Sequence, residues 1–459
     1  MKTVAFDTET WRFQPGLQAP RLVCAAFSDG TEDYLDASEE GIDRLHLLCH
    51  DTDTMLIGHN VAYDAIVCMN HDPARMTPAV FKAYREGRVS CTLVREKLIR
   101  LAHGEMSFHA TRQGLKPTDF KLSSLVKRYV GADITATKKG PDAWRTRYAE
   151  LDGVPVEEWP KAVSEYALDD ARLTLAAWQA QAAHEEAPAG SVIDFDTGMV
   201  INELDQVRGH LALMLMTTWG LRTDPAPVAL LKKALTKEVT GANSKLVALG
   251  LKKVDKKGKV SKNMKAIKEM VEEAFGGDPP MTDTGRPKTD KETLEKCDPD
   301  KYPGLALLAE TTGSAKLLDA FVPVLESGTA HPTNPQYDIL KETGRTSSYN
   351  FNVQQMPRKG GVRECFIPRE GWYYVSIDYD TLELRALAQT CLDLFGWSRM
   401  AEALKSGLDP HLDFAADILG IEYETALAWR SGNEGPEKKK LVGENRQMAK
   451  AANFGYPGG

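Results

Sequence analysis

The stretch VAFDTE, residues 4–9, decides how the first part of the chain folds, because a short apolar run ends there on two acids. Side chains of a β-strand alternate between its faces, so a strand over these residues places Asp7 and Glu9 on one face. Such a pair costs folding energy unless a cation or solvent meets the charges. The pair therefore marks a candidate metal site, although acids at strand ends are also common on ordinary surfaces.

The sequence around this strand predicts an α/β domain that ends near residue 185, before the break EEAPAGSVIDFD. Small and β-branched apolar residues favour two further strands, at residues 21–27 and 55–60. Helical spacing of apolar residues follows at residues 61–72, 91–103 and 165–186.

Two further acids strengthen the metal-site hypothesis. GHNVAYD places Asp64 just past a strand, and YALDD places Asp170 on a helix with Tyr166 one turn earlier on the same face. Four carboxylates that converge without basic partners bind hard divalent cations. Two such ions generate a hydroxide and stabilise the leaving oxygen in phosphodiester hydrolysis. The alternative is a set of surface acids beside a packed tyrosine.

The motifs DTET, HNVAYD and YALDD, in this order, resemble the 3′→5′ proofreading exonuclease domain of DNA polymerases. The resemblance implies an RNase H-like fold for residues 1–185 and Mg²⁺ (or Mn²⁺) as cofactor, with two ions at the site. It implies as metal ligands Asp7, Glu9, Asp64 and Asp170. It also implies that Tyr166 orients the attacking water and that Asn60 lies near the primer terminus. Asp169 is one residue too close to Tyr166, so Asp170 is preferred.

Two stretches in the second half resemble family-A DNA polymerases: TGRTSSYNFNVQQMP (residues 343–357) and DYDTLELR (residues 378–385). The resemblance implies DNA contacts from Arg345, Asn352 and Gln354. It makes Asp378 one of two catalytic metal-binding aspartates and Glu383 the side chain that excludes a 2′-hydroxyl. An apolar strand, GWYYVSI, is expected to end on Asp378. Where the family often has Ser-Gln, this chain has Asp380-Thr381.

Two further segments resemble the fingers of the same family, LDPHLDFAADILG (residues 408–420) and RQMAKAANFG (residues 446–455). In the second, Arg446, Lys450 and Phe454 share one helix face. The resemblance implies that His411, Arg446 and Lys450 lie at the phosphates of a dNTP and that Phe454 contacts its sugar and base. His411 as an ordinary surface residue and Asp409 as a helix cap are the alternatives. The family's template-side tyrosine falls on Gly458, and Tyr456 replaces it only if the helix end rearranges.

The resemblance implies a right-hand polymerase fold after the nuclease. The expected parts are a mostly helical thumb at residues 195–340, a partial palm at 341–395 and partial fingers at 396–459. No motif with a second palm carboxylate follows Asp378. We therefore expect a phage-like, C-terminally incomplete polymerase, completed by a second chain or interrupted in its reading frame. Alone it is expected to trim DNA 3′ ends without extending primers. The alternatives are a stand-alone exonuclease, of DNA or of RNA, and a non-catalytic DNA-binding subunit.

The composition limits the partners. A net charge of −8 speaks against nucleic-acid binding, but residues 251–268 hold eight lysines and one aspartate. This segment is either a solvated helical hairpin or an arm that binds DNA phosphates, since affinity follows the phosphates neutralised locally. No apolar run approaches the ~20 residues of a membrane span. The expected partners are a DNA primer–template and dNTPs, and the expected location is the cytoplasm (of a host, if the source is viral).

Overall fold

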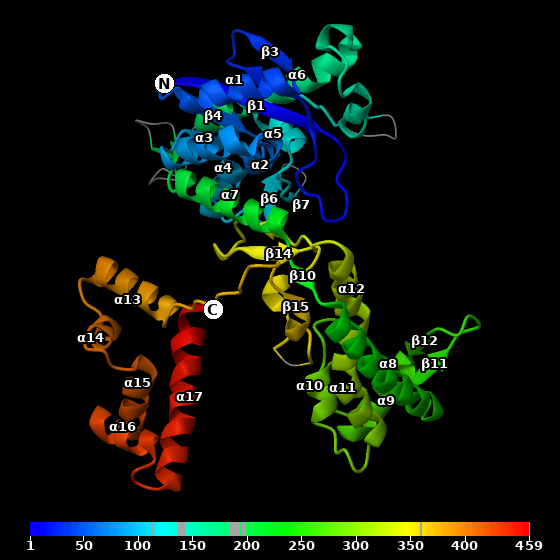
Figure 1. Cartoon of the computed structure of the whole chain (residues 1–459). Helices are drawn as coiled ribbons and strands as arrows, with labels where there is room; N and C mark the ends of the chain where they lie inside the picture. Colours follow the sequence, from blue (N-terminus) through cyan, green and yellow to red (C-terminus); the bar gives the residue numbers. More distant parts are fainter. Residues whose placement is uncertain (112–113, 136–142, 184–192, 195–198, 359, 459) are drawn as a thin grey trace. The chain divides into compact units, whose positions relative to one another are not determined.

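The computed structural model of the chain describes residues 1–111, 114–135, 143–183, 193–194, 199–358 and 360–458 (Figure 1). The chain forms two compact units, Met1–Trp372 and Tyr373–Gly459, and each is described by itself. Among the described residues, none of the helices combines the length and the apolar character that crossing a membrane requires.

The first unit begins with a five-stranded sheet in the order β3-β2-β1-β4-β5. Its central strand β1 (Lys2–Thr10) runs antiparallel to β2 (Leu22–Ser28) and parallel to β4 (Thr54–Gly58). Strands β3 (Asp33–Ala37) and β5 (Val89–Cys91) form the edges. The three strands expected from the sequence are therefore confirmed.

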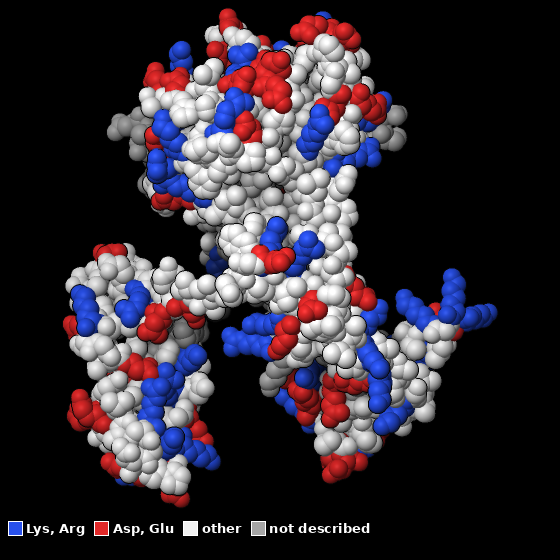
Figure 2. Space-filling view, viewed as in Figure 1, with Lys and Arg blue, Asp and Glu red and all other residues white. Residues whose placement is uncertain are grey.

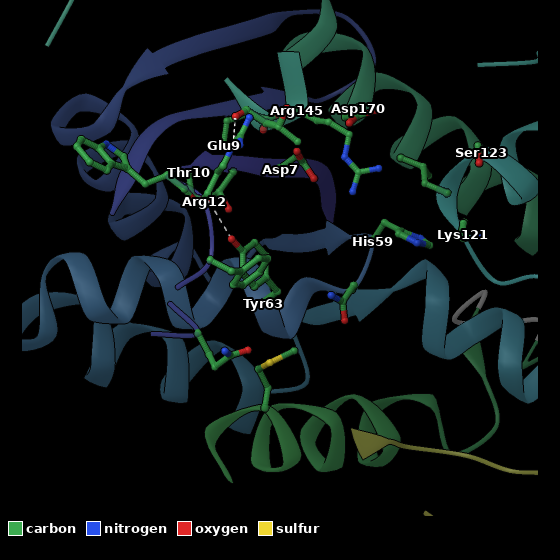
Figure 3. A pocket seen from close by; sticks show the side chains of 18 of the residues that line it. Asp7, Glu9, Thr10, Arg12, His59, Tyr63, Lys121, Ser123, Arg145 and Asp170 are labelled. Atoms are coloured by element: carbon green, nitrogen blue, oxygen red, sulfur yellow. Dashed lines mark hydrogen bonds between the residues drawn. The ribbon is translucent and has the colours of Figure 1, made fainter. Parts of the chain in front are cut away.

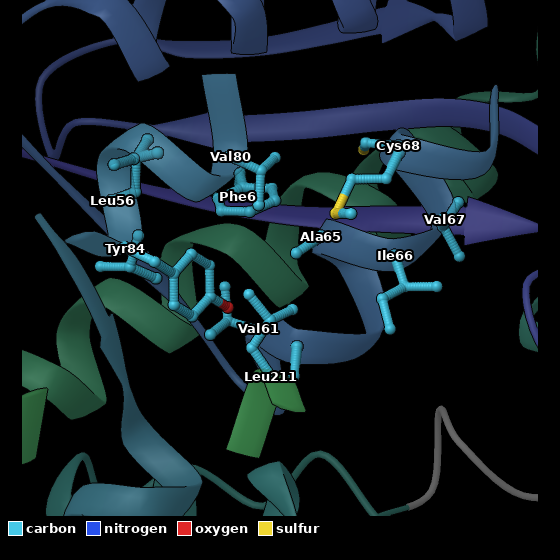
Figure 4. Close-up of a cluster of buried hydrophobic side chains, with 14 of the residues drawn as sticks. Phe6, Leu56, Val61, Ala65, Ile66, Val67, Cys68, Val80, Tyr84 and Leu211 are labelled. Atoms are coloured by element: carbon cyan, nitrogen blue, oxygen red, sulfur yellow. The ribbon is translucent and has the colours of Figure 1, made fainter. Parts of the chain in front are cut away.

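The two faces of β1 face different helices. Phe6 lies in a buried apolar cluster with residues of α1 (Ser38–His50), α2 (Val61–His71), α3 (Pro73–Arg85) and α7 (Glu203–Trp219), shown in Figure 4. Ala5, on the opposite face, packs against Leu175 of α6 (Lys161–Ala183). Full burial of a side chain as large as Phe6 or Leu175 contributes about 1.5–3 kcal/mol to the stability of the fold. Because strand faces alternate, Asp7 and Glu9 share the α6 face with Ala5.

Helix α7 is joined to the α/β domain of residues 1–183 by a buried ion pair. The Nε of Arg95, on α4 (Thr92–Ala102), donates to Glu203 Oε2 at 2.8 Å, and both side chains are fully buried. Glu203 also accepts from the Ser90 hydroxyl and, at 3.1 Å, from the backbone N–H of Val200. These bonds satisfy the buried carboxylate, so the first helix after the α/β domain is anchored inside that domain.

Four helices follow around a second apolar core that includes Leu246, Leu251, Leu294 and Leu305. They are α8 (Pro225–Ala248), α9 (Met264–Ala274), the short α10 (Lys291–Glu295) and α11 (Pro303–Lys316). Helix α12 (Val322–Ala330) lies in another buried cluster, where Leu325 joins Val228 of α8. This helical organisation agrees with the pattern predicted for residues 195–340.

The lysine-rich segment is a β-hairpin followed by α9, so the helical-hairpin interpretation is wrong. Strands β11 (Lys252–Val254) and β12 (Val260–Lys262) pair antiparallel, and Figure 2 shows lysine side chains gathered over them. The reason is the turn between them, where Asp255 Oδ1 accepts from the N–H groups of Lys257 and Lys259, and Gly258 adopts a φ of 79°. Asp and Gly at these places favour a turn over a helix.

The first unit ends with two short strand pairs. Strands β13 (Gln336–Asp338) and β14 (Ser347–Tyr349) form one hairpin. Strand β10 (Arg222–Thr223) pairs with β15 (Phe366–Ile367). The boundary between the two units falls at Trp372–Tyr373, within residues 341–395 that were expected to form a partial palm.

The strand expected to precede Asp378 is not formed in this structure. Residues 372–379 are irregular, and Tyr373 and Ile377 are 89% and 85% exposed. A strand needs neighbouring backbone groups for its hydrogen bonds. The described part of the chain supplies no paired strand here, so the β-branched and aromatic pattern alone does not produce one.

The second unit is helical, as its sequence predicts. It consists of α13 (Leu382–Phe395), α14 (Arg399–Lys405), α15 (Pro410–Leu419), α16 (Tyr423–Ser431) and α17 (Pro436–Gly458). Its buried core joins Leu412, Ala416, Ala426 and Val442, which come from α15, α16 and α17.

Candidate active site and nucleotide-binding helices

Three of the four acids predicted as metal ligands lie together. One carboxylate oxygen each of Asp7, Glu9 and Asp170 lies within 4.8 Å of the others (Figure 3). Strand β1 presents the first two on its α6 face, and α6 approaches that face through the small buried residues Ala167 and Ala171. Hard carboxylate oxygens gathered in this way suit Mg²⁺ or Mn²⁺. This is the one group of three or more candidate metal ligands among the described residues.

Asp64 lies beside this group but outside it. Its carboxylate is buried in the first turn of α2 and accepts from the Thr8 N–H at 3.1 Å and the Thr8 hydroxyl at 2.6 Å. Burial raises the pKa of Asp64 to about 7, the bonds from Thr8 oppose that rise, and the charge of Asp170 adds to it. That Asp64 is a metal ligand stays a prediction.

Tyr166 lies on α6 one turn before Asp170 and lines the same cavity as the acids. Burial, and then the negative charges of Asp170 and Glu9, raise the pKa of the Tyr166 hydroxyl well above its usual range. The hydroxyl therefore keeps its proton at neutral pH and can both donate and accept a hydrogen bond. Its ring lies 6.3 Å from that of Tyr148, which is buried beneath it.

The acids open into a cavity of about 930 Å³. Figure 3 shows Asp7, Glu9 and Asp170 along its upper side, with Tyr63 and His59 below. Asn60 also lines it and adopts a left-handed φ of 62° at the N-cap of α2. The resemblance of the GHNVAYD motif implies a position for Asn60 near the primer terminus, and that role stays a prediction.

Several cavity residues were missed by sequence reasoning. Tyr63 and His59 lie within the GHNVAYD motif itself. Their positions next to Asp64 and Asn60 in the sequence could have indicated that they line the same cavity. Arg145, in a short 3₁₀-helix at Trp144–Thr146, gave no signal, nor did Arg12 or Lys121. Together these cations face a cavity that also holds carboxylates, an arrangement that suits a phosphodiester neutralised partly by arginine and lysine and partly by metal.

The polymerase-like segment at residues 343–357 belongs to the first unit. Asn352 Oδ1 accepts from the Ser348 hydroxyl at 2.8 Å and from the Gln355 N–H at 3.2 Å, so this side chain caps a short 3₁₀-helix, Val353–Gln355. Gln354 Nε2 donates to the Thr346 hydroxyl at 3.1 Å. Arg345 and Gln354 are exposed. Their contacts with DNA stay predictions.

In the second unit, Asp378 and Glu383 are both exposed, Asp378 in the irregular segment and Glu383 in the first turn of α13. Thr381, the N-cap of α13, has a left-handed φ of 50°. The described residues of this unit hold no group of three candidate metal ligands around Asp378. The metal role of Asp378 therefore remains a prediction.

His411 is buried, so the interpretation as an ordinary surface histidine is wrong. Its ring Nδ1 lies 3.0 Å from Asn453 Nδ2. Its backbone N–H donates to Asp409 Oδ1 at 3.0 Å. Burial lowers the pKa of His411; Asp409 opposes this, and the charges of Arg446 and Lys450 add to it. A neutral imidazole is thus favoured here.

Asp409 caps α15, as the alternative interpretation proposed, and it also holds two arginines. It accepts from the N–H of His411 and of Leu412. Its Oδ2 lies 2.7 Å from Arg430 Nη1 and 2.7 Å from Arg446 Nη2. The Asp409 carboxylate therefore orients Arg446. A phosphate group carries the same sign of charge as this carboxylate.

Lys450 lies exposed on α17, one turn beyond Arg446. Phe454 belongs to the same helix, and its side chain, like that of Tyr456, lies outside what the structure describes. Arg446 and Lys450 therefore give α17 a cationic face, and the position of the Phe454 side chain relative to it is not described.

Known proteins with similar sequences point to the same two regions. Residues 1–180 match the family model described as a 3′-5′ exonuclease, and residues 236–457 match that of DNA polymerase family A. Residues 1–180 are thus similar to the 3′-5′ exonuclease family and residues 236–457 to DNA polymerase family A, and the expected fold class is confirmed.

The similar curated proteins are named DNA polymerase I. That of Deinococcus radiodurans is 30% identical over 182 residues, 38% of this chain and 17% of the relative. That of Aquifex aeolicus is 27% identical over 278 residues, 56% of this chain and 44% of the relative. That of Lactococcus lactis subsp. cremoris is 32% identical over 122 residues, 25% of this chain and 12% of the relative. The matched segments therefore span less than half of each relative.

A solved structure with a similar fold is the POL domain of Pol1 from M. smegmatis in complex with DNA primer-template and dNTP. It has a TM-score of 0.56 and 16% identity, with 99% of this chain and 73% of that chain covered. At this identity the likeness concerns the fold alone.

Proposed function

We propose that the chain removes nucleotides from DNA 3′ ends at the site formed by Asp7, Glu9, Asp64 and Asp170. The observation that carries the proposal is the meeting of Asp7 and Glu9 of β1 with Asp170 of α6 in a cavity lined by cations. This geometry suits a negatively charged phosphodiester that is hydrolysed with divalent metal ions. The family match over residues 1–180 supports the same activity.

The residues present fit two Mg²⁺ or Mn²⁺ ions, because all four acids offer hard oxygen ligands. When bound, such ions supply a hydroxide at neutral pH and stabilise the leaving oxygen. Tyr166, protonated and beside Asp170, orients the attacking water through its hydroxyl. Asn60 holds the terminal nucleotide, and Arg12 and Arg145 neutralise its phosphates.

The experiment compares one acid of the group with an acid that lies outside it. In the full-length protein, Asp7→Asn is expected to reduce the Mg²⁺-dependent trimming of a 5′-labelled single-stranded oligonucleotide by about 100-fold or more, because removing a transition-state charge partner costs several kcal/mol. Asp169→Asn is the matched control, since Asp169 pairs with Arg172 at 3.1 Å and lies outside the acid group. Equal rates for Asp7→Asn and the unaltered chain would refute the assignment.

The rest of the chain is proposed to act in template-directed DNA synthesis with this nuclease as its proofreading site. Arg345, Asn352 and Gln354 bind the primer–template, and the lysine hairpin at residues 252–262 binds duplex phosphates. Asp378 holds catalytic metal. The dNTP is bound by Glu383, His411, Arg446, Lys450 and Phe454. The support is the family match over residues 236–457, and the work takes place in the cytoplasm, where DNA and dNTPs are available.

Synthesis by a two-metal step needs a second carboxylate beside Asp378. We propose that a second chain or a further segment supplies it together with strands that pair with residues 372–377. The purified 459-residue chain is then expected to incorporate no dNTP on a primed template. Templated incorporation by this chain alone, abolished by Asp378→Ala, would contradict the proposal.

A stand-alone 3′→5′ DNA exonuclease is the second candidate. It is favoured by the contrast between the gathered acids of the first unit and the exposed Asp378 of the second. Screening for proteins that bind the chain and restore templated synthesis separates the two candidates.

A further inference from the structure

Two histidines lie one turn apart on α1, outside the acid group. His46 and His50 are four residues apart on this helix, a spacing that places two side chains next to each other on one helix face. Their ring centroids are 4.6 Å apart, with an angle of 62° between the ring planes. Histidine is the commonest metal ligand in proteins. The His46–His50 pair therefore has both the ligand type and the spacing of a metal chelate.

The separation of the two rings fits a shared metal ion. Zn²⁺ lies about 2.0–2.1 Å from a histidine nitrogen, so two nitrogens on one ion are no more than about 4.2 Å apart. The ring edges that face each other are closer than the centroids, which brings nitrogens of the two rings into this range. His50 is exposed and His46 half-buried, so water can reach an ion held between them.

The buried side of α1 holds the backbone beneath the pair in place. Ile42, Leu45 and Cys49 are each at most 1% exposed and belong to the apolar cluster of Phe6. Because the helix is already packed, binding of an ion has little chain to order. Burial raises the pKa of the Cys49 thiol to about 12, so this neighbour of His50 stays protonated and the imidazoles are the ligands.

The charge at this end of α1 favours a cation. His50 lies in the last turn of the helix, where the helix dipole leaves partial negative charge on the terminal carbonyl groups. Asp51, the C-cap residue, adds a carboxylate directly after it. Hydrogen bonds from the Thr54 hydroxyl and the Asp53 N–H lower the pKa of Asp51, so this carboxylate is charged at neutral pH.

The pair lies across the sheet from the acid group. Helix α1 packs on the Phe6 face of β1, whereas Asp7 and Glu9 share the α6 face. The cavity that holds the acids is lined from Asp7 to Tyr349, and neither histidine lines it. The donor atoms differ as well, because carboxylates suit Mg²⁺ and Mn²⁺, whereas imidazoles suit Zn²⁺, Ni²⁺ and Cu²⁺.

We propose that His46 and His50 bind one transition-metal ion of the class of Zn²⁺, Ni²⁺ and Cu²⁺, with water completing its coordination. The ion ties the last two turns of α1 together and stabilises the first unit without entering the acid group. The first unit then has two metal sites of different selectivity, one of hard oxygens and one of imidazoles. The inference goes beyond the proposed exonuclease and polymerase functions and depends on neither of them.

The test is isothermal titration calorimetry of the full chain with Ni²⁺, in an excess of Mg²⁺ that occupies sites of hard oxygens. His46→Gln and His50→Gln are each expected to raise Kd about tenfold or more, since loss of even an outer partner of a ligand costs about 10- to 100-fold. His103→Gln is the matched control, because His103 is an exposed histidine at the C-cap of α4. A Kd for His46→Gln within about twofold of the unaltered chain would overturn the proposal.

A further variant keeps the number of histidines and changes only their spacing. Leu47→His combined with His50→Gln puts the two imidazoles at neighbouring positions, which do not face each other on a helix. Leu47 is 70% exposed, so the fold accommodates the change. This variant is expected to bind Ni²⁺ as weakly as His50→Gln alone. Affinity equal to that of the unaltered chain would contradict a chelate at this spacing.

Stability provides a second readout. Ni²⁺ that binds the folded chain is expected to raise the urea midpoint of the unaltered protein, and EDTA is expected to reverse the rise. The midpoint of His46→Gln is expected to stay the same with and without Ni²⁺. An equal rise in both proteins would place the bound ion elsewhere and contradict the assignment. Neither measurement involves DNA, so failure of the proposed exonuclease function leaves both results unaffected.

Discussion

Acid is expected to destabilise the first unit through His210, a buried histidine of α7. Burial, and then the charge of Lys97, lower the pKa of His210 to about 4, while Asp338 opposes the change. Unfolding returns the imidazole to water, where its pKa is about 6.5. Because the unfolded chain binds more protons between these two values, stability falls as the pH falls from about 6.5 to about 4. The full difference of about 2.5 pH units corresponds to about 3 kcal/mol, most of which is lost by pH 4.5.

The assay is urea unfolding followed by tryptophan fluorescence at neutral pH and at about pH 4.5, for the unaltered chain and for His210→Gln. Glutamine removes the titrating group at similar size. The unaltered chain is expected to lose about 2–3 kcal/mol more than the variant between the two pH values. Equal losses for both proteins would refute the account, since His210 would then not be the group that protonates on unfolding.

Two further predictions concern buried charge. Glu203→Ala is expected to destabilise the first unit by about 3–5 kcal/mol in urea unfolding, because Arg95 stays buried without its partner. A loss under about 1 kcal/mol would argue against the Arg95–Glu203 pair as the anchor of α7. Asp409→Ala is expected to lower the melting temperature of the second unit, since it removes a helix cap with a typical contribution of about 1 kcal/mol and the acceptor of two arginines. An unchanged melting transition would show that the cap is dispensable.

Local periodicity predicted the group of Asp7, Glu9 and Asp170 well. The period of two along β1 places Asp7 beside Glu9, and the one-turn spacing on α6 places Tyr166 beside Asp170. These relations depend on a single strand or helix, so sequence alone is sufficient. The helices of the second unit followed from the same kind of local pattern.

The remaining features depend on contacts between distant residues. Gln336 meets Gln18 across 318 positions, and no local pattern relates Tyr349 to Asp7. The strand expected before Asp378 failed for a related reason, because its β pattern specifies an element that needs a partner. The helical-hairpin alternative for the lysine segment was wrong because the Asp255–Gly258 turn favours a β-hairpin.

The most direct test of the central claim is the product ladder of the full chain on a 5′-labelled single-stranded DNA with Mg²⁺. The account predicts stepwise shortening from the 3′ end by one nucleotide at a time, absent in EDTA and restored by Mn²⁺. Internal cuts, shortening from the 5′ end, or trimming that persists in EDTA would contradict the assignment of Asp7, Glu9 and Asp170 as a metal-dependent 3′→5′ exonuclease site.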